Sequence, residues 1–228
     1  MYKVSGVTTL NTLANSLWGK ARIGLEYALK RSGPMSMAPS QLGAFTRSDP
    51  AQPWPNIEYH VQPLSLEAFG EPLHSFPAIT ASVCNLNPTS RGTVHIRSAR
   101  FGDAPAIAPN YLATQADQRV AVDSLRLTRR IAAQPALAPF APQEYKPGTQ
   151  FQTDDELVRL AGDIATTIFH PVGTTAMGRD GDAMAALDSH LRVRDGRGGL
   201  IAGLRVVDAG AMPTITSGNT NSPTLMMA

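Results

Sequence analysis

The sequence is poor in the residues that build disulfide frameworks, metal centres and membrane spans. Its one cysteine, Cys84, excludes an internal disulfide and a site made of several thiolates. The five histidines do not fall at ligand spacings, and no EF-hand or His-Glu-x-x-His pattern occurs, so the sequence predicts no metal site. It also has no run of about eighteen apolar residues and no signal-peptide layout. We therefore expect no integral membrane segment.

Charge is scarce as well. Charged residues make up 17% of the chain, the net charge is +2, and the basic clusters are short, which disfavours nucleic acid as a partner. Hydrophobic residues make up 43%, enough for a sizeable core, while 18 prolines and 19 glycines favour a loop-rich globular fold over a helical bundle. A single cysteine suits a reducing compartment, so we expect a cytoplasmic protein, with peripheral attachment at the inner membrane as the alternative.

Residue periodicity predicts an α+β fold with a mixed, mainly antiparallel sheet and flanking helices. Alternation predicts strands at residues 57–62, 76–85 and 92–98, and the turn residues 88–92 predict a hairpin-like connection between the last two. Helical spacing predicts helices at residues 5–31, 120–131 and 154–168, the last with a capping box of Thr153 and Glu156. The segment 35–55 is predicted to be a surface loop.

Two C-terminal segments concentrate groups that can do chemistry. His170 is expected at the end of the third helix, before Pro171, where its imidazole is exposed; a histidine that merely caps the helix is an equally good interpretation. The stretch 214–222 is rich in Thr, Ser, Gly and Asn, and precedes a helix that Ser222 is expected to cap. Such a stretch is typical of a ligand-contacting loop, although a buried strand at 204–207 followed by an ordinary loop is the plainer alternative.

The order and spacing of five short motifs resemble the C-terminal signature of glucose-methanol-choline (GMC) oxidoreductases, in their choline dehydrogenase and bacterial alcohol dehydrogenase branch. These motifs are His170-Pro-Val-Gly-Thr174, Leu191-Arg-Val193, Leu204-Arg-Val-Val-Asp-Ala209, Met212-Pro-Thr214 and Ser217-Gly-Asn-Thr-Asn-Ser-Pro-Thr224. Upstream, residues 86–92 and 108–112 are similar to the substrate-domain sheet of the family, and the resemblance weakens before residue 35.

The resemblance implies an activity and a cofactor. The family oxidises an alcohol by passing a hydride to N5 of FAD, with a histidine at the position of His170 as the base. Asn221 occupies the partner position and would donate to the developing alkoxide. Gly210 departs from the family, which usually has serine there. The residues implied to contact FAD are Phe169, Asp208, Ala209, Asn221, Ser222, Pro223 and Thr224.

A second set of expectations follows from what the chain lacks relative to the family. It has no Gly-x-Gly-x-x-Gly motif, since Gly196-Arg-Gly198 is followed by Ile201 where the third glycine belongs. We therefore expect a C-terminal fragment, truncated in its last helix, whose partners are an alcohol substrate and the N-terminal FAD-binding half of the same enzyme. Its expected segments are a helical lead-in (1–34), a substrate-binding part (35–168) and a catalytic, flavin-contacting part (169–228).

Two alternatives stay open. One is a flavin-containing hydroxynitrile lyase of the same fold, in which a histidine also moves a proton but no net hydride transfer occurs. The other is a non-catalytic orphan substrate-binding domain.

Overall fold

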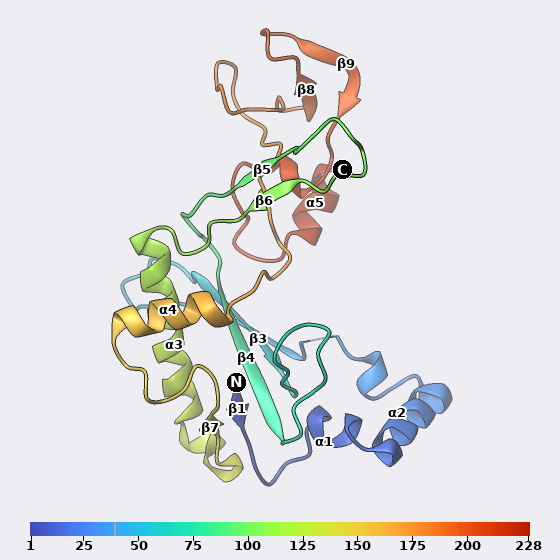
Figure 1. Ribbon diagram of the computed structural model, residues 1–228, viewed down its shortest axis with the longest axis vertical. Helices are drawn as coiled ribbons and strands as arrows, with labels where there is room; N and C mark the ends of the chain where they lie inside the picture. Colours follow the sequence, from blue (N-terminus) through green and yellow to red (C-terminus); the bar gives the residue numbers. More distant parts are fainter. Residues whose placement is uncertain (39) are drawn as a thin grey trace. The chain divides into compact units, whose positions relative to one another are not determined.

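A five-stranded antiparallel sheet organises the first part of the fold. The computed structural model describes residues 1–38 and 40–228. The strands run in the spatial order β2-β3-β4-β1-β7 (Figure 1), and the long pair β3–β4 extends from Ile57 opposite Asn85 to Gln62 opposite Thr80. The predicted α+β class is confirmed. The strand bounds are β1 (Tyr2–Lys3), β2 (Leu42–Thr46), β3 (Ile57–Gln62), β4 (Ala78–Asn85) and β7 (Gln143–Glu144).

Helices flank this sheet. The Tyr59 hydroxyl of β3 lies 2.9 Å from Thr128 Oγ1 of α3, so this helix packs on the face of the sheet that carries Tyr59. Within the described residues, no helix has the length and apolar character needed to cross a bilayer. The elements are α1 (Leu10–Ala14), α2 (Leu17–Lys30), η1 (Pro34–Ser36), α3 (Gln115–Ala132), η2 (Pro135–Phe140) and α4 (Asp154–Ile164).

A buried ion pair ties α3 to the edge strand β7. Arg129 donates from Nε to Glu144 Oε2 and from Nη2 to Glu144 Oε1, both at 2.9 Å. The same guanidinium donates to the carbonyls of Gly148 and Phe151. The Arg129 side chain is 18% exposed and that of Glu144 4% exposed. This network holds the 144–151 loop against α3.

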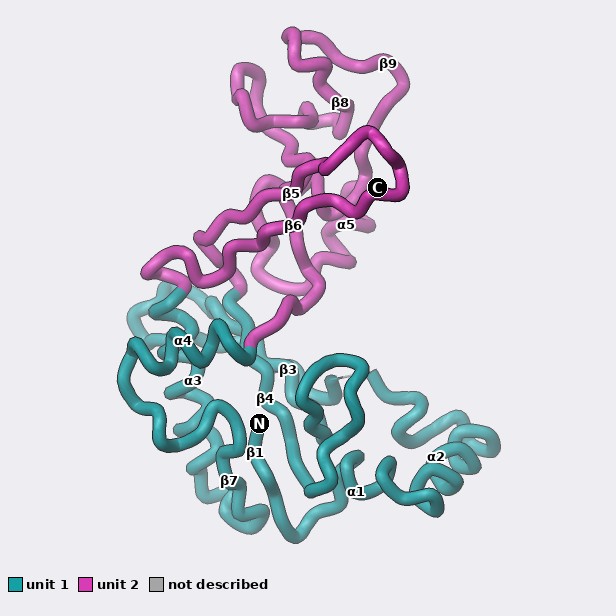
Figure 2. The backbone as a smooth tube through the Cα atoms, viewed as in Figure 1, with its two compact units in different colours: residues 1–85, 118–164 teal, residues 86–117, 165–228 magenta. Residues whose placement is uncertain are grey.

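The described chain divides into two compact units (Figure 2). Unit 1 holds residues 1–85 and 118–164, and unit 2 holds residues 86–117 and 165–228. The predicted division at residues 34/35 and 168/169 remains a prediction, because it concerns segments rather than compact units.

Unit 2 is built from two short antiparallel ribbons, a single 3-10 turn and a short α-helix. Its core is formed by Leu187, Leu191 and Ala211, with Met177 and Met227 packed against them. The elements are β5 (Thr93–His95), β6 (Ala106–Ala108), β8 (Arg192–Arg194), β9 (Leu200–Arg205), η3 (Ala209–Ala211) and α5 (Asn221–Met227).

Two strand predictions were wrong. The strand after residue 92 is shorter, and β5 pairs with β6 rather than with β4, so residues 88–92 do not form a hairpin. The reason is a competing partner: the backbone N–H groups of Thr89 and Ser90 donate to the Asp117 carboxylate, both at 2.8 Å. The alternative of a buried strand at 204–207 does not hold either, because residues 204 and 205 end the fully exposed strand β9 and residues 206 and 207 lie outside any strand.

Three local predictions were also wrong. The helix expected to reach residue 168 ends at Ile164, because the following Thr-Thr-Ile run is β-branched and Phe169 adopts a positive φ of 65°. The last helix begins at Asn221 with Thr220, not Ser222, as its N-cap. The expected 35–55 loop contains β2, which pairs with β3; Pro39, in the same segment, lies outside the described residues.

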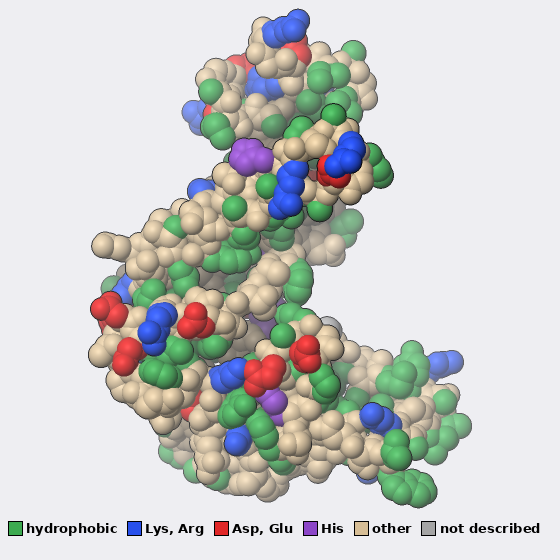
Figure 3. Space-filling view, viewed as in Figure 1, with side chains coloured by type: hydrophobic (Ala, Val, Ile, Leu, Met, Phe, Trp, Pro, Cys, Tyr) green, Lys and Arg blue, Asp and Glu red, His purple; other side chains and the backbone are tan. Residues whose placement is uncertain are grey.

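Large hydrophobic side chains are exposed on several elements (Figure 3). On α2 they are Leu17, Trp18, Leu25 and Leu29, with Trp18 86% exposed. On β9 and α5 they include Leu200, Ile201, Leu204, Leu225 and Met226. Contiguous apolar patches, where exposed side chains of this kind gather, are typical of interaction surfaces.

Candidate active site around His170

The imidazole of His170 is held by two residues of the loop that precedes α5. Its Nδ1 lies 3.1 Å from Thr220 Oγ1, and the amide nitrogen of Asn219 lies 2.9 Å from its Nε2. Thr220 is buried, His170 is half-buried and Asn219 is exposed. The ring is therefore fixed at both nitrogens while one side stays accessible.

These two contacts select one tautomer of the neutral ring. An amide N–H can only donate, so Nε2 accepts from Asn219 and carries the lone pair. The proton then belongs to Nδ1, which donates to the Thr220 hydroxyl. Nε2 is thus the nitrogen that can take up a proton, and Thr220 holds the opposite side of the ring.

The segment that carries His170 is anchored on the 208–213 turn. The backbone N–H of Thr175 donates to the Gly210 carbonyl at 3.0 Å, and that of Met177 to the Ala211 carbonyl at 2.9 Å. Gly173, with a φ of +82°, lies so close to the Met212 carbonyl that an added Cβ would come within 3.4 Å of it. These bonds position the turn that follows His170.

Gly210, the departure from the family pattern, fills a tight position. An added Cβ would lie 2.5 Å from Thr174 Oγ1 and 2.9 Å from Thr175 Oγ1. Thr175 Oγ1 is itself buried and without a hydrogen-bond partner among the described residues. Glycine at residue 210 therefore accommodates Thr174, the last residue of the His170 motif, and Thr175, which follows it.

The last motif of the predicted signature contacts the upstream segment 86–92. Asn87 of the upstream motif donates from its amide to Ser217 Oγ at 2.7 Å, and Ser217 adopts a positive φ of 53°. The upstream segment 86–92 and the motif 217–224 thus meet within unit 2. Their contact holds the loop that carries Asn219 and Thr220.

The predicted partner Asn221 lies next to this site. It is the first residue of α5 and is exposed, and neither its amide nor the hydroxyl of Ser222 makes a side-chain hydrogen bond within the described chain. Both groups are free to bind a ligand. Asn219 and Thr220, which make the described contacts of His170, were predicted only as members of the ligand-contacting stretch and not as partners of the imidazole.

None of the remaining predicted cofactor residues is fully buried. The Phe169 side chain is 64% exposed; Pro223, Thr224 and Ala209 are half-buried. Thr224 donates its hydroxyl to the Thr220 carbonyl, and Asp208 Oδ1 accepts the backbone N–H of Gly210 at 2.7 Å. An exposed aromatic ring and free amide and hydroxyl groups beside His170 suit a flavin, which has an apolar face and a polar pyrimidine edge.

A separate cluster lies in unit 1. Glu58, His60 and Cys84 bring their ligand atoms within 4.8 Å of one another. Burial, and then the negative charge of Glu58, raises the pKa of the Cys84 thiol to about 11. Spacing along the sequence could not reveal this cluster, since Cys84 comes from another strand.

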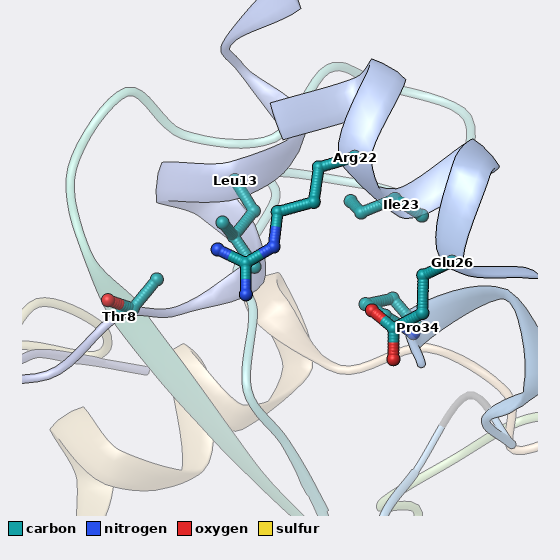
Figure 4. A pocket seen from close by; sticks show the side chains of 6 residues that line it. All are labelled: Thr8, Leu13, Arg22, Ile23, Glu26 and Pro34. Carbon is teal, nitrogen blue, oxygen red and sulfur yellow. The ribbon is translucent and has the colours of Figure 1, made fainter. Parts of the chain in front are cut away.

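A small pocket in unit 1 has a different character. It is bounded by α1, α2 and η1, and Figure 4 shows Arg22 and Glu26, one helical turn apart on α2, at its wall. Glu26 accepts from the Ser32 hydroxyl at 3.2 Å. The other lining residues are Thr8, Leu13, Ile23 and Pro34, a set without the base found at His170.

Comparison with known proteins supports the resemblance. The model of the GMC oxidoreductase family matches residues 88–228. Oxygen-dependent choline dehydrogenases are 39% identical over 211 residues in Vibrio vulnificus and 38% identical over 213 residues in Pseudomonas fluorescens. These alignments cover 92% and 93% of this chain but 37% and 36% of those proteins, so the chain spans less than two fifths of their length.

Solved structures give the same assignment. Pyridoxine 4-oxidase from Mesorbium loti is 29% identical, with a TM-score of 0.72 over 83% of this chain and 36% of that one. A formate oxidase shares the fold at 20% identity, with a TM-score of 0.85 over 99% of this chain and 43% of that one. The match of the family model to residues 88–228, more than half of the chain, shows that the chain belongs to the GMC oxidoreductase family.

Proposed function

We propose that this chain is the substrate-binding part of a cytoplasmic, FAD-dependent alcohol oxidoreductase that works together with an N-terminal FAD-binding half. The single observation that carries the proposal is the imidazole of His170, fixed through Thr220 and Asn219 with a basic nitrogen on its accessible side. Primary alcohols are the proposed substrates. Choline is the first to test, because the relatives of known activity are named choline dehydrogenases.

FAD, when bound, would accept the hydride of the carbinol carbon at its N5, which takes both electrons of the C–H bond. Residues of this chain take up the hydroxyl proton. His170 Nε2 takes the hydroxyl proton as the carbonyl double bond forms, a role for which imidazole is the usual general base in enzymes. The alcohol becomes an aldehyde, and the imidazole leaves the step protonated.

Thr220 and Asn219 have distinct proposed roles. Thr220 accepts from Nδ1–H and keeps the lone pair on Nε2, so the base always points the same way. Asn219 donates to that lone pair in the described state, so a substrate hydroxyl must replace it before proton transfer begins. Exchange of one donor for another costs little, because Nε2 is never left unpaired.

Asn221 is proposed to stabilise the oxygen that loses its proton. Its carboxamide can donate to a developing alkoxide but cannot act as a base, so the proton transfer falls to His170. The free hydroxyl of Ser222 and the exposed ring of Phe169 would contact the flavin. Asp208, Ala209, Pro223 and Thr224 complete the proposed flavin-contacting set.

Flavin reduction tests this function directly. We expect the chain, purified together with its FAD-binding half, to lose the oxidised flavin absorbance when choline or another primary alcohol is added without oxygen. A flavin that stays oxidised while a cyanohydrin is cleaved would identify a hydroxynitrile lyase instead. Failure to retain any flavin in the reassembled protein would favour an orphan binding domain. Either of these results would overturn the proposal.

A further inference from the structure

Three metal-ligating side chains converge on one face of the sheet in unit 1. Glu58 and His60 are two residues apart on β3, so they point to the same side. Cys84 of β4 lies directly opposite Glu58 in the antiparallel register and therefore shares that side. The pairing of β3 with β4 brings a carboxylate, an imidazole and a thiol within 4.8 Å of one another.

The described residues leave part of the charge and hydrogen-bonding capacity of this cluster unmet. Glu58 is only 4% exposed, and the nearest group able to balance its charge is His60 Nε2, 3.2 Å from Oε1. That nitrogen is buried but makes no properly oriented hydrogen bond to any described residue. A buried carboxylate beside an unpartnered imidazole nitrogen is costly unless something else binds there.

We propose that Glu58, His60 and Cys84 bind a borderline-soft divalent cation, with Zn²⁺ as its representative, and leave a fourth position for water. Carboxylate oxygen, imidazole nitrogen and thiolate sulfur are each ordinary zinc ligands. Glu58 and the Cys84 thiolate together balance the two positive charges. The site is independent of the chemistry proposed at His170.

The geometry is close to what such an ion requires. Ligands about 2.0–2.3 Å from a tetrahedral Zn²⁺ lie roughly 3.3–3.8 Å from one another. The 3.2 Å between His60 and Glu58 already fits, and the widest separation of the cluster, at most 4.8 Å, closes with a small rotation of side chains. Binding would also displace the thiol proton of Cys84, which the cation's own charge favours.

Cobalt is a sensitive probe, because thiolate-bound Co²⁺ has an intense near-ultraviolet charge-transfer band. Cys84 is the chain's only cysteine, so such a band in the untagged 228-residue chain can come from no other residue. We expect Co²⁺ to produce this band with one ion per chain and Zn²⁺ to abolish it by displacement. Absence of the band would overturn the proposal.

Variants then identify the other ligands. Cys84→Ser should eliminate the band, while His60→Gln and Glu58→Gln should each weaken Co²⁺ binding at least about tenfold. The matched control is His95→Gln, an exposed histidine on β5, which should bind like the unaltered chain. If the His60 and Glu58 variants bind Co²⁺ as tightly as the unaltered chain does, the thiol binds the metal alone, and the proposal is overturned.

X-ray absorption identifies the ligand atoms in the unaltered chain, so it tests the proposal even if a variant fails to fold. Zinc bound to the unaltered chain should show one sulfur and otherwise nitrogen and oxygen neighbours. A first shell without sulfur would overturn the proposal by itself, and would leave Glu58 and His60 as an ion pair beside an uninvolved thiol.

Discussion

Replacing His170 by alanine in the enzyme reassembled with its FAD-binding half is expected to slow alcohol-dependent flavin reduction at least about a hundredfold. The reason is chemical: the carbinol carbon is a poor hydride donor until a base removes the proton of the hydroxyl group, and Nε2 of His170 is the proposed base. Flavin content should stay nearly unchanged, because the imidazole contacts Thr220 and Asn219 and supports no core residue. Anaerobic stopped-flow absorbance measures the rate.

The control is His190→Ala, which removes an exposed histidine of the same unit. Flavin in this variant should be reduced by the alcohol at the same rate as in the unaltered enzyme. Equal rates for His170→Ala and the unaltered enzyme would show that the base is another group.

The two asparagines beside His170 should behave differently. Asn221→Ala removes the proposed alkoxide donor and should slow flavin reduction by about ten- to a thousandfold. Asn219→Ala removes a donor that the substrate replaces, so it should leave the rate within a few-fold of the unaltered enzyme. The same stopped-flow experiment compares them. The reverse order of effects would assign the stabilising role to Asn219 and contradict the predicted His170–Asn221 pair.

The largest expected effect on stability is at Arg129. Arg129→Met should lower the free energy of unfolding by about 3–5 kcal/mol, because it leaves the Glu144 carboxylate, 4% exposed, without its bidentate partner. It also removes the donors to the Gly148 and Phe151 carbonyls. Urea unfolding followed by circular dichroism measures the change.

Arg126→Met is the matched control, one turn away on the same helix. Arg126 pairs with Asp154, but their side chains are 42% and 49% exposed, so the loss should not exceed about 1 kcal/mol. A double replacement, Arg129→Met with Glu144→Leu, should recover part of the loss, since no buried charge is then left alone. Equal unfolding midpoints for Arg129→Met and Arg126→Met would contradict the argument.

Predictions based on local signals succeeded most often. The alternation at residues 57–62 gave the bounds of β3, and the capping box is formed, with Thr153 Oγ1 accepting from the Glu156 N–H and Glu156 from the Thr153 N–H. Both depend on residues within one element. The family signature, read from the order and spacing of five short motifs between residues 170 and 224, led to the family.

Predictions that needed distant partners failed or were not made. Nothing near residues 88–92 indicates that N–H groups of this segment donate to the Asp117 carboxylate. Likewise, nothing in residues 42–46 indicates that this segment pairs with β3. For the same reason the Thr220 and Asn219 contacts of His170, and the approach of Cys84 to Glu58, could be found only in three dimensions.

The way the chain alternates between its two units constrains how it can be made. It passes from one unit to the other after residues 85, 117 and 164, so neither unit is a continuous stretch. On the ribosome, the sheet of unit 1 stays incomplete until β7, at residues 143–144, has emerged, and α4 follows only by residue 164. No single truncation can yield one unit alone: an isolated unit 2 would require excision of residues 118–164 and a new peptide link across the gap.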